Sequence, residues 1–337
     1  SFIVFDLFAK PVIQRKMGAK IPERKTVRAY MSQNLKSTEG AVEFIRTNLG
    51  NVDNIPVAAP ISRGADALMS LVRADGLIRI DADRSEIKAG EVVDIDLLRT
   101  EGDIRTKVMM AGTYDICFDL LRDHLLQQFG DLSMVMSNTG SMKGLAALGA
   151  GYCHIAGVHL FDDETGEYNT PIIRRFFNDM PLVVINCFHR HLGFMVPKGN
   201  PKNILTFQDL TRSDVKIINR FRGAGTRLVF DYYLKENQID INRIQGYSNE
   251  VHTHMTVAHA VSSGSADVGM GIAPAAKASG LDFIPLIKER LDLVIPKKFL
   301  NAYPVKSLLK VLNSKEFKEE AGNLDGYDFG STGTVIY

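Results

Sequence analysis

Hydrophobic and polar positions follow two different periods along this chain, and the change falls near residue 100. Over residues 21–98, apolar and polar residues alternate, as at Val27, Ala29 and Met31. Alternation with a period of two is typical of half-buried strands. The segment is therefore predicted to form a small, mostly β domain, with one helix over residues 65–72.

From about residue 106 onward, short apolar segments alternate with helical patterns. Strands are predicted over 107–110, 132–136, 182–186, 193–196, 215–218, 266–270, 282–286 and 291–295, and helices over 115–128, 142–148, 226–236, 253–262 and 306–321. This alternation is typical of βαβ units built on a parallel sheet. The fold class predicted for the second part of the chain is therefore α/β.

The N-terminal segment has a helical pattern of its own. Residues 2–16 are predicted to form an amphipathic helix that begins without a capping residue, and we interpret residues 1–20 as the end of a domain that precedes this chain. Asp6 interrupts the apolar start, and no basic residues precede it, which is unlike a signal peptide. No run of about 18 apolar residues is present. We therefore expect a soluble, cytoplasmic protein without a membrane span.

Composition narrows the class of protein. Of the 337 residues, 45% are hydrophobic and 23% are charged, and the formal net charge is +1. These values are ordinary for a globular protein and argue against a nucleic-acid-binding domain, which would concentrate basic residues on one face. The three cysteines, Cys117, Cys153 and Cys187, fit no zinc or redox spacing and are predicted to be buried free thiols.

Three predicted strand-to-helix junctions combine glycine with serine or threonine. They are Gly112-Thr113-Tyr114-Asp115, Ser137-Asn138-Thr139-Gly140-Ser141 and Gly223-Ala224-Gly225-Thr226-Arg227. Free N–H groups and the positive end of the helix dipole bind anions at such places, and Arg227 adds a fixed positive charge. A single hydroxyl residue before a helix is often only an N-cap. Three such junctions at the carboxyl ends of parallel strands predict a shared oxyanion cleft.

The remaining chemistry in the sequence is sparse. His254 opens a predicted helix between His252 and His259, where a neutral imidazole can contact an anion or serve only the structure. No carboxylate completes a recognisable metal-ligand set around these histidines. Dinucleotide, phosphate-loop and nucleophile-elbow motifs all fail on spacing. We therefore predict no catalytic residue and no metal.

The segment over residues 106–321 resembles the periplasmic-binding-protein-like domains related to LysR substrate-binding domains and to molybdate and tungstate receptors. The stretches that carry this resemblance are 112–115, 138–145, 154–160, 165–169, 219–227 and 257–271. It implies two lobes, one over about 106–188 and 291–320 and the other over about 193–285. The ligand-binding residues predicted from the junctions and the resemblance together are Thr113, Tyr114, Asn138, Thr139, Ser141, Gly225, Thr226, Arg227 and His254. Receptors of this kind bind mostly with neutral donors, so pairing of Arg227 with a carboxylate stays open.

The segment over residues 21–103 resembles the C-terminal β domain of MoeA-type molybdopterin molybdotransferases. The resemblance rests on residues 56–58, 64–68, 74–78 and 88–93, and residues 5–18 are similar to the helix that closes the cofactor-binding domain of that family. In that family the active site lies mainly in the preceding domain. The resemblance therefore implies that this chain has no transferase activity by itself.

Together these observations favour a non-catalytic domain, over residues 104–337, that binds a small oxyanion between two lobes. Molybdate or tungstate is the expected ligand, with no covalently bound cofactor, in a sensor or capture module for molybdenum cofactor biosynthesis. One alternative is a part of a molybdotransferase that needs its missing domain or a partner chain. The other is an interaction module that forms a homodimer through its N-terminal region and binds a peptide or an organic ligand in the cleft.

Overall fold

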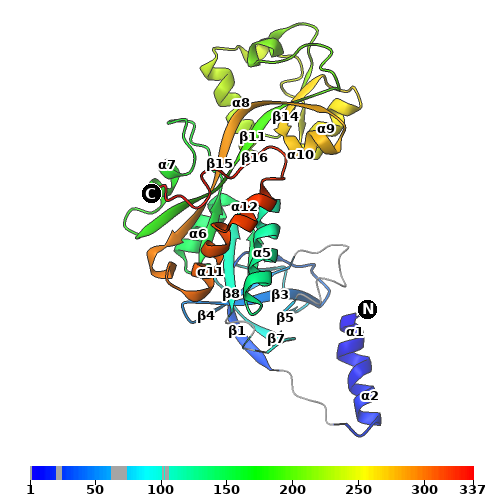
Figure 1. The fold of residues 1–337 in the computed structure, drawn as a ribbon. Coiled ribbons are helices and arrows are strands. Elements are labelled where there is room, and N and C mark those ends of the chain that lie inside the picture. The colour runs from blue at the N-terminus through cyan, green and yellow to red at the C-terminus, as the bar shows by residue number, and fades with distance from the viewer. Residues whose placement is uncertain (1, 20–24, 62–73, 101, 103–105) are drawn as a thin grey trace. The chain divides into compact units, whose positions relative to one another are not determined.

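The computed structural model (Figure 1) describes residues 2–19, 25–61, 74–100, 102 and 106–337. The chain divides into two compact units. Unit 1 comprises residues 1–114 and 125–156, and unit 2 comprises residues 115–124 and 157–337. The helix predicted over residues 65–72 lies outside the described residues. Within the described part of the chain, no helix combines the length and the apolar character that a membrane crossing requires.

A closed β barrel forms the first part of unit 1, with the strand order β1-β4-β3-β5-β7. These strands are β1 (Thr26–Met31), β3 (Glu43–Val52), β4 (Ile55–Pro60), β5 (Gly76–Ile80) and β7 (Val92–Leu97), and the short strands β2 (Leu35–Lys36) and β6 (Glu86–Ile87) pair with each other. Alternate residues such as Met31, Leu49 and Ile78 fill the barrel core. Asp53 and Asn54, both at positive φ, form the tight turn between β3 and β4. The predicted small β domain is confirmed.

The helical pattern at the start of the chain is also confirmed. The segment consists of α1 (Phe2–Val4), a π-helical turn (Phe5–Ala9) and α2 (Lys10–Lys16). Pro11 near the start of α2 has no N–H to donate to the preceding turn, and irregular helical turns commonly occur beside such a residue. Val4, Phe8 and Val12 are exposed. Homodimerisation through this region stays a prediction.

The second part of unit 1 contains two parallel strands. They are β8 (Lys107–Gly112) and β9 (Ser133–Asn138), which α5 (Ile116–Phe129) connects, and α6 (Ser141–Gly149) follows β9. Gly144 on α6 lies against the backbone of β8, because a Cβ at this residue would be 2.6 Å from Cα of Gly112. The absence of a side chain here brings the N-terminus of α6 close to the end of β8.

The barrel and the parallel strands of unit 1 share a buried interface. Asp75 of the barrel forms an ion pair with Lys107 of β8, with side-chain exposures of 1% and 9%. The hydroxyls of Ser32 and Ser137 lie 3.5 Å apart, and Gly50 of β3 packs directly on Met109 of β8. The two parts of unit 1 therefore form one packed body.

Unit 2 is built on a sheet with the strand order β13-β12-β14-β11-β15. The strands are β13 (Glu250–Val251), β12 (Ile217–Arg220), β14 (Val268–Ile272), β11 (Leu182–Val196) and β15 (Asp282–Pro296), while β10 (Ile155–Val158) lies across the boundary of the two units. β12 runs parallel to its neighbours β13 and β14, and β11 runs antiparallel to β14 and β15. The α/β prediction is confirmed.

Two of the predicted strand boundaries were wrong. The segments 182–186 and 193–196 belong to the single long strand β11, and 282–286 and 291–295 belong to β15 (Figure 1). The sequence suggested a break because charged residues occupy the middle of each segment. The strands continue through these residues because the charges pair across them, as Arg190 does with Glu289.

Several helices of unit 2 pack on the strands of this sheet, and others follow to the end of the chain. They are α7 (Thr170–Phe176), α8 (Gly225–Glu236), α9 (His254–Ser262), α10 (Ala273–Ala278), α11 (Tyr303–Leu312) and α12 (Lys315–Ala321), with short 3-10 turns at Phe207–Thr211, Ile241–Arg243 and Lys297–Phe299. The helix predicted over 306–321 is in fact two helices. Ser314 separates them because its hydroxyl caps α12 by accepting the Phe317 N–H at 3.2 Å. A last short strand, β16 (Tyr327–Asp328), pairs with β11.

Candidate anion-binding site

The loop from β12 to α8 supplies the first element of a candidate site in unit 2. The N-cap of α8, Ala224, offers no side-chain acceptor to the first turn, and Thr226 in that turn is buried. A Cβ on Gly225 would lie 3.7 Å from Cε1 of His159, which places the imidazole of His159 beside the N-terminus of α8. This end of the helix carries a positive partial charge. The geometry suits an anion.

Arg220, the last residue of β12, supplies a charge without a counter-charge. Its Nη2 donates to the carbonyl oxygen of His252 at 2.9 Å. Its Nε is buried and has no hydrogen-bond partner among the described residues, and no described carboxylate forms an ion pair with it. Burial lowers the pKa of this guanidinium. A half-buried charge of this kind gains free energy when an anion pairs with it.

His254 is the first residue of α9 and lies in the same part of unit 2. Its Nδ1 is buried without a hydrogen-bond partner among the described residues, 3.4 Å from where a Cβ on Gly271 of β14 would be. Burial, together with the positive charges of Arg220 and Arg190, lowers the pKa of His254 to about 3. His254 is therefore a neutral imidazole at physiological pH.

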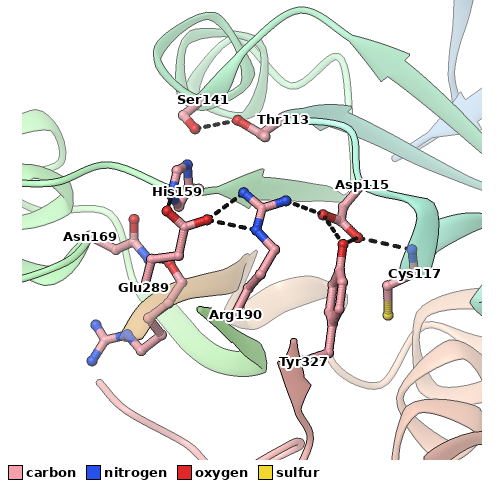
Figure 2. A network of polar contacts seen from close by, with 10 residues as sticks. Thr113, Asp115, Cys117, Ser141, His159, Asn169, Arg190, Glu289 and Tyr327 are labelled. Atoms are coloured by element: carbon pink, nitrogen blue, oxygen red, sulfur yellow. Dashed lines mark hydrogen bonds and ion pairs between the residues drawn. The ribbon is translucent and has the colours of Figure 1, made fainter. Parts of the chain in front are cut away.

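A buried ion network adjoins these groups, and Figure 2 shows Arg190 between two carboxylates. Its Nε donates to Oε1 of Glu289 at 2.7 Å, and its Nη1 donates to Oδ2 of Asp115 at 2.8 Å. The hydroxyl of Tyr327 donates to Asp115 at 3.0 Å, and Nε2 of His159 lies 2.8 Å from Oε2 of Glu289. Every charge of this network has a partner.

The pKa values in the network follow from these contacts. Burial alone would raise the pKa of Glu289, but Arg190 and His159 outweigh it and hold this pKa well below its usual range. The ring of Tyr168 stacks on His159 with centroids 5.8 Å apart. Its hydroxyl is buried and has no hydrogen-bond partner in the described part of the chain. Burial and the negative charge of Glu289 raise the pKa of Tyr168, so this phenol stays protonated.

Unit 1 brings together two of the hydroxyls predicted from sequence. The Oγ1 of Thr113, which follows β8, lies 2.6 Å from the Oγ of Ser141, the first residue of α6 (Figure 2). Asn138 ends β9, and Thr139 donates its N–H to the Gly112 carbonyl at 3.0 Å. The side chain of Tyr114 is exposed. The anion-binding role of these five residues stays a prediction.

Arg227 has the partners that the sequence left open. Its Nε lies 2.9 Å from both carboxylate oxygens of Asp231, its Nη1 donates to Glu250 at 2.9 Å, and the guanidinium lies over the ring of Tyr247. Its charge is therefore compensated within the protein, in contrast to that of Arg220. Of the two arginines near this junction, Arg220 is the one whose charge a bound anion would compensate.

The prediction from sequence did not select Arg190, Arg220, His159 or Glu289. A signal for two of them was present, since Arg190 and Glu289 are charged residues in the middle of long apolar strands. No group of three or more histidine, cysteine, aspartate or glutamate side chains suited to a metal ion was found among the residues that the structure describes. All three cysteines are free and buried, as predicted.

Two family models match this chain. The model described as the PBP superfamily domain matches residues 122–313, and the model described as the MoeA C-terminal region (domain IV) matches residues 28–98. The second match covers the strands of the barrel of unit 1. The first begins within α5 and ends after α11.

Individual proteins are similar to the chain as well. YvgK of Bacillus subtilis (strain 168) is 39% identical over 236 residues, which are 70% of this chain and 75% of that protein. The thiosulfate-binding protein of Escherichia coli (strain K12) is 29% identical over 148 residues, 39% of this chain and 42% of that protein. An ABC-type phosphate transport receptor from Vibrio cholerae has a TM-score of 0.45 at 16% identity, covering 63% of this chain and 96% of the receptor. The chain belongs to the PBP superfamily, and its two-lobed α/β domain follows a MoeA C-terminal region.

Proposed function

We propose that this chain binds a small oxyanion, without catalysing a reaction on it, through Arg220, the first turn of α8 and His254. The observation that carries the proposal is the uncompensated charge of Arg220 beside a helix N-terminus. A guanidinium in such a place gains strong, charge-assisted hydrogen bonds when an anion arrives. The neutral imidazole of His254 adds a polar group without a competing charge.

The proposed ligand is molybdate or tungstate, and the proposed role is that of a sensor or capture module in molybdenum cofactor biosynthesis. The MoeA C-terminal region supports this choice, because the domain that binds the anion is joined to a region of a molybdenum-related family. A relative whose name states that it binds thiosulfate supports the wider class of tetrahedral oxyanions.

Thermal unfolding with molybdate, tungstate, thiosulfate, sulfate, phosphate and citrate tests the proposal directly. An anion at about 100 times its dissociation constant stabilises the folded state by about 2.7 kcal/mol, which raises the melting temperature measurably. We expect molybdate or tungstate to give the largest rise. A rise with citrate alone would favour an organic ligand, and no rise with any of the six would contradict oxyanion binding.

We further propose that the anion closes a hinge between a lobe over about 106–188 and 291–320 and a lobe over about 193–285. Both β11 and β15 run from the first of these ranges into the second, and both contain register irregularities in between. A ligand shifts such an equilibrium only if it binds the closed form more tightly. Small-angle scattering is expected to show a smaller radius of gyration with a saturating anion, and an unchanged value would contradict the hinge.

A further inference from the structure

We propose that binding of a dianion at this site is coupled to the uptake of one proton by His254. The inference rests on the proposed function and adds how that site is regulated. It starts from a buried ring nitrogen, Nδ1 of His254, that has no partner among the described residues. An imidazole held in that way can gain a proton when the charges around it change.

The charges that face His254 come from several elements of unit 2. Arg220 lies on β12, Arg190 on β11, Glu289 on β15, and His159 just after β10. Arg190 and His159 both contact the carboxylate of Glu289, and the charge of Arg190 is compensated by Glu289 and Asp115. Arg220 therefore leaves the surroundings of the imidazole positive, and the N-terminus of α9 acts in the same direction.

A dianion reverses this balance. One of its two negative charges compensates Arg220, and the second remains in the cluster that contains His254. A unit charge about 4 Å away, at an effective dielectric constant of about 20, changes a pKa by about 3. The pKa of His254, about 3 in the free protein, is then expected to reach about 6 in the complex. A monoanion has no charge left over and leaves His254 neutral.

The sign of the pH dependence follows. Because the pKa is higher in the complex than in the free protein, binding takes up a proton between about pH 3 and pH 6. Affinity for a dianion therefore rises as the pH falls through the upper part of this window. With these two pKa values, the dissociation constant is expected to be about tenfold lower at pH 5 than at pH 7.

The experiment measures dissociation constants by isothermal titration calorimetry at pH 5, 6 and 7. Sulfate and thiosulfate serve as probes because they stay dianionic over this range, and molybdate is used at pH 6 and 7. His254→Gln keeps a neutral polar side chain, and His252→Gln, at an exposed residue two positions away, is the matched control. We expect the full chain and His252→Gln to show the pH dependence. His254→Gln is expected to bind more weakly than the full chain at pH 7, and its dissociation constant is expected not to change between pH 5 and pH 7.

Histidine resonances provide the second readout. The His254 ring is expected not to titrate above pH 5 in the free protein and to titrate near pH 6 with the anion bound. Affinities that do not change with pH in the unsubstituted chain would overturn the inference while the proposed function stands. An affinity of His254→Gln that still depends on pH would also overturn the inference and leave the proposed function intact. If none of the probes binds at any pH, the proposed function fails and this inference fails with it.

Discussion

Replacing Arg220 by glutamine is expected to abolish the stabilisation of this chain by its anion. Arg220 is a half-buried cation that has no counter-charge among the described residues, so its charge is what the anion compensates. Removing one partner of a buried, hydrogen-bonded charge pair costs about 2–5 kcal/mol of binding free energy, and the half-buried Arg220 is expected to lie at the lower end of this range because solvent screens it. At an anion concentration of about 100 times the dissociation constant of the unsubstituted chain, the stabilisation of about 2.7 kcal/mol would then largely disappear. The melting temperature of the variant would rise little or not at all when the anion is added.

Two other arginines serve as controls for this variant. Arg222→Gln removes a charge whose side chain is 78% exposed, and we expect anion binding to persist. Arg227→Gln leaves Asp231 and Glu250 without their shared partner, so it should lower the free energy of unfolding by about 1.5–3 kcal/mol and still bind the anion. If Arg227→Gln abolishes binding and Arg220→Gln does not, the assignment made from sequence holds and ours does not.

Replacing Arg190 by methionine is expected to lower the free energy of unfolding by about 3–5 kcal/mol, because removal of one partner leaves buried charges uncompensated. The two carboxylates that would be left, Glu289 and Asp115, have side-chain exposures of 2% and 3%. Urea unfolding at pH 7 measures the change as a lower midpoint. Arg79→Met is the matched control, since Arg79 and its partner Asp81 are 63% exposed, and it should change stability by no more than about 0.5 kcal/mol.

The destabilisation by Arg190→Met is also expected to depend on pH. Arg190 and His159 hold the pKa of Glu289 well below its usual range, so the stability that this carboxylate contributes is present above its unfolded-state pKa and is lost only in strong acid. In the variant this pKa rises, and protonation then removes the buried charge. The difference in stability between the two proteins should therefore shrink from pH 7 to pH 4. An equal difference at both values would contradict an electrostatic cause.

The sequence was sufficient for most of the architecture. The alternation at Val27, Ala29 and Met31 predicted the strands of a small β domain, because burial of every second side chain is a local property of a strand. That these strands close into a barrel was not predicted. The length of β11 was not predictable in the same way. His189, Arg190 and His191 look like the end of a strand until their partners on β15 are known, since Glu289 is 99 residues away in the chain.

The candidate site was less predictable, for a related reason. Arg220 and Arg227 flank the same junction, and which of them is uncompensated depends on where the carboxylates lie. One sign was available, because Asp231 is four residues after Arg227 on the same helix and such pairs interact. The ion pair of Arg227 with Glu250 depends on the tertiary structure. The absence of a described counter-charge at Arg220 depends on it as well. Residue type identified the junction, and only the fold distinguishes the two arginines.

The ion pair between Asp75 and Lys107 affects how this protein can be shortened. A fragment that begins near residue 106 would retain Lys107 without its carboxylate and would expose the face of β8 on which Gly50 packs. Such a fragment should express poorly or aggregate, whereas the same fragment with Lys107 replaced by methionine should be better tolerated. For the same reason, a protein in which only the barrel is exchanged for that of another protein is expected to fold only if the new barrel has a carboxylate at the position of Asp75.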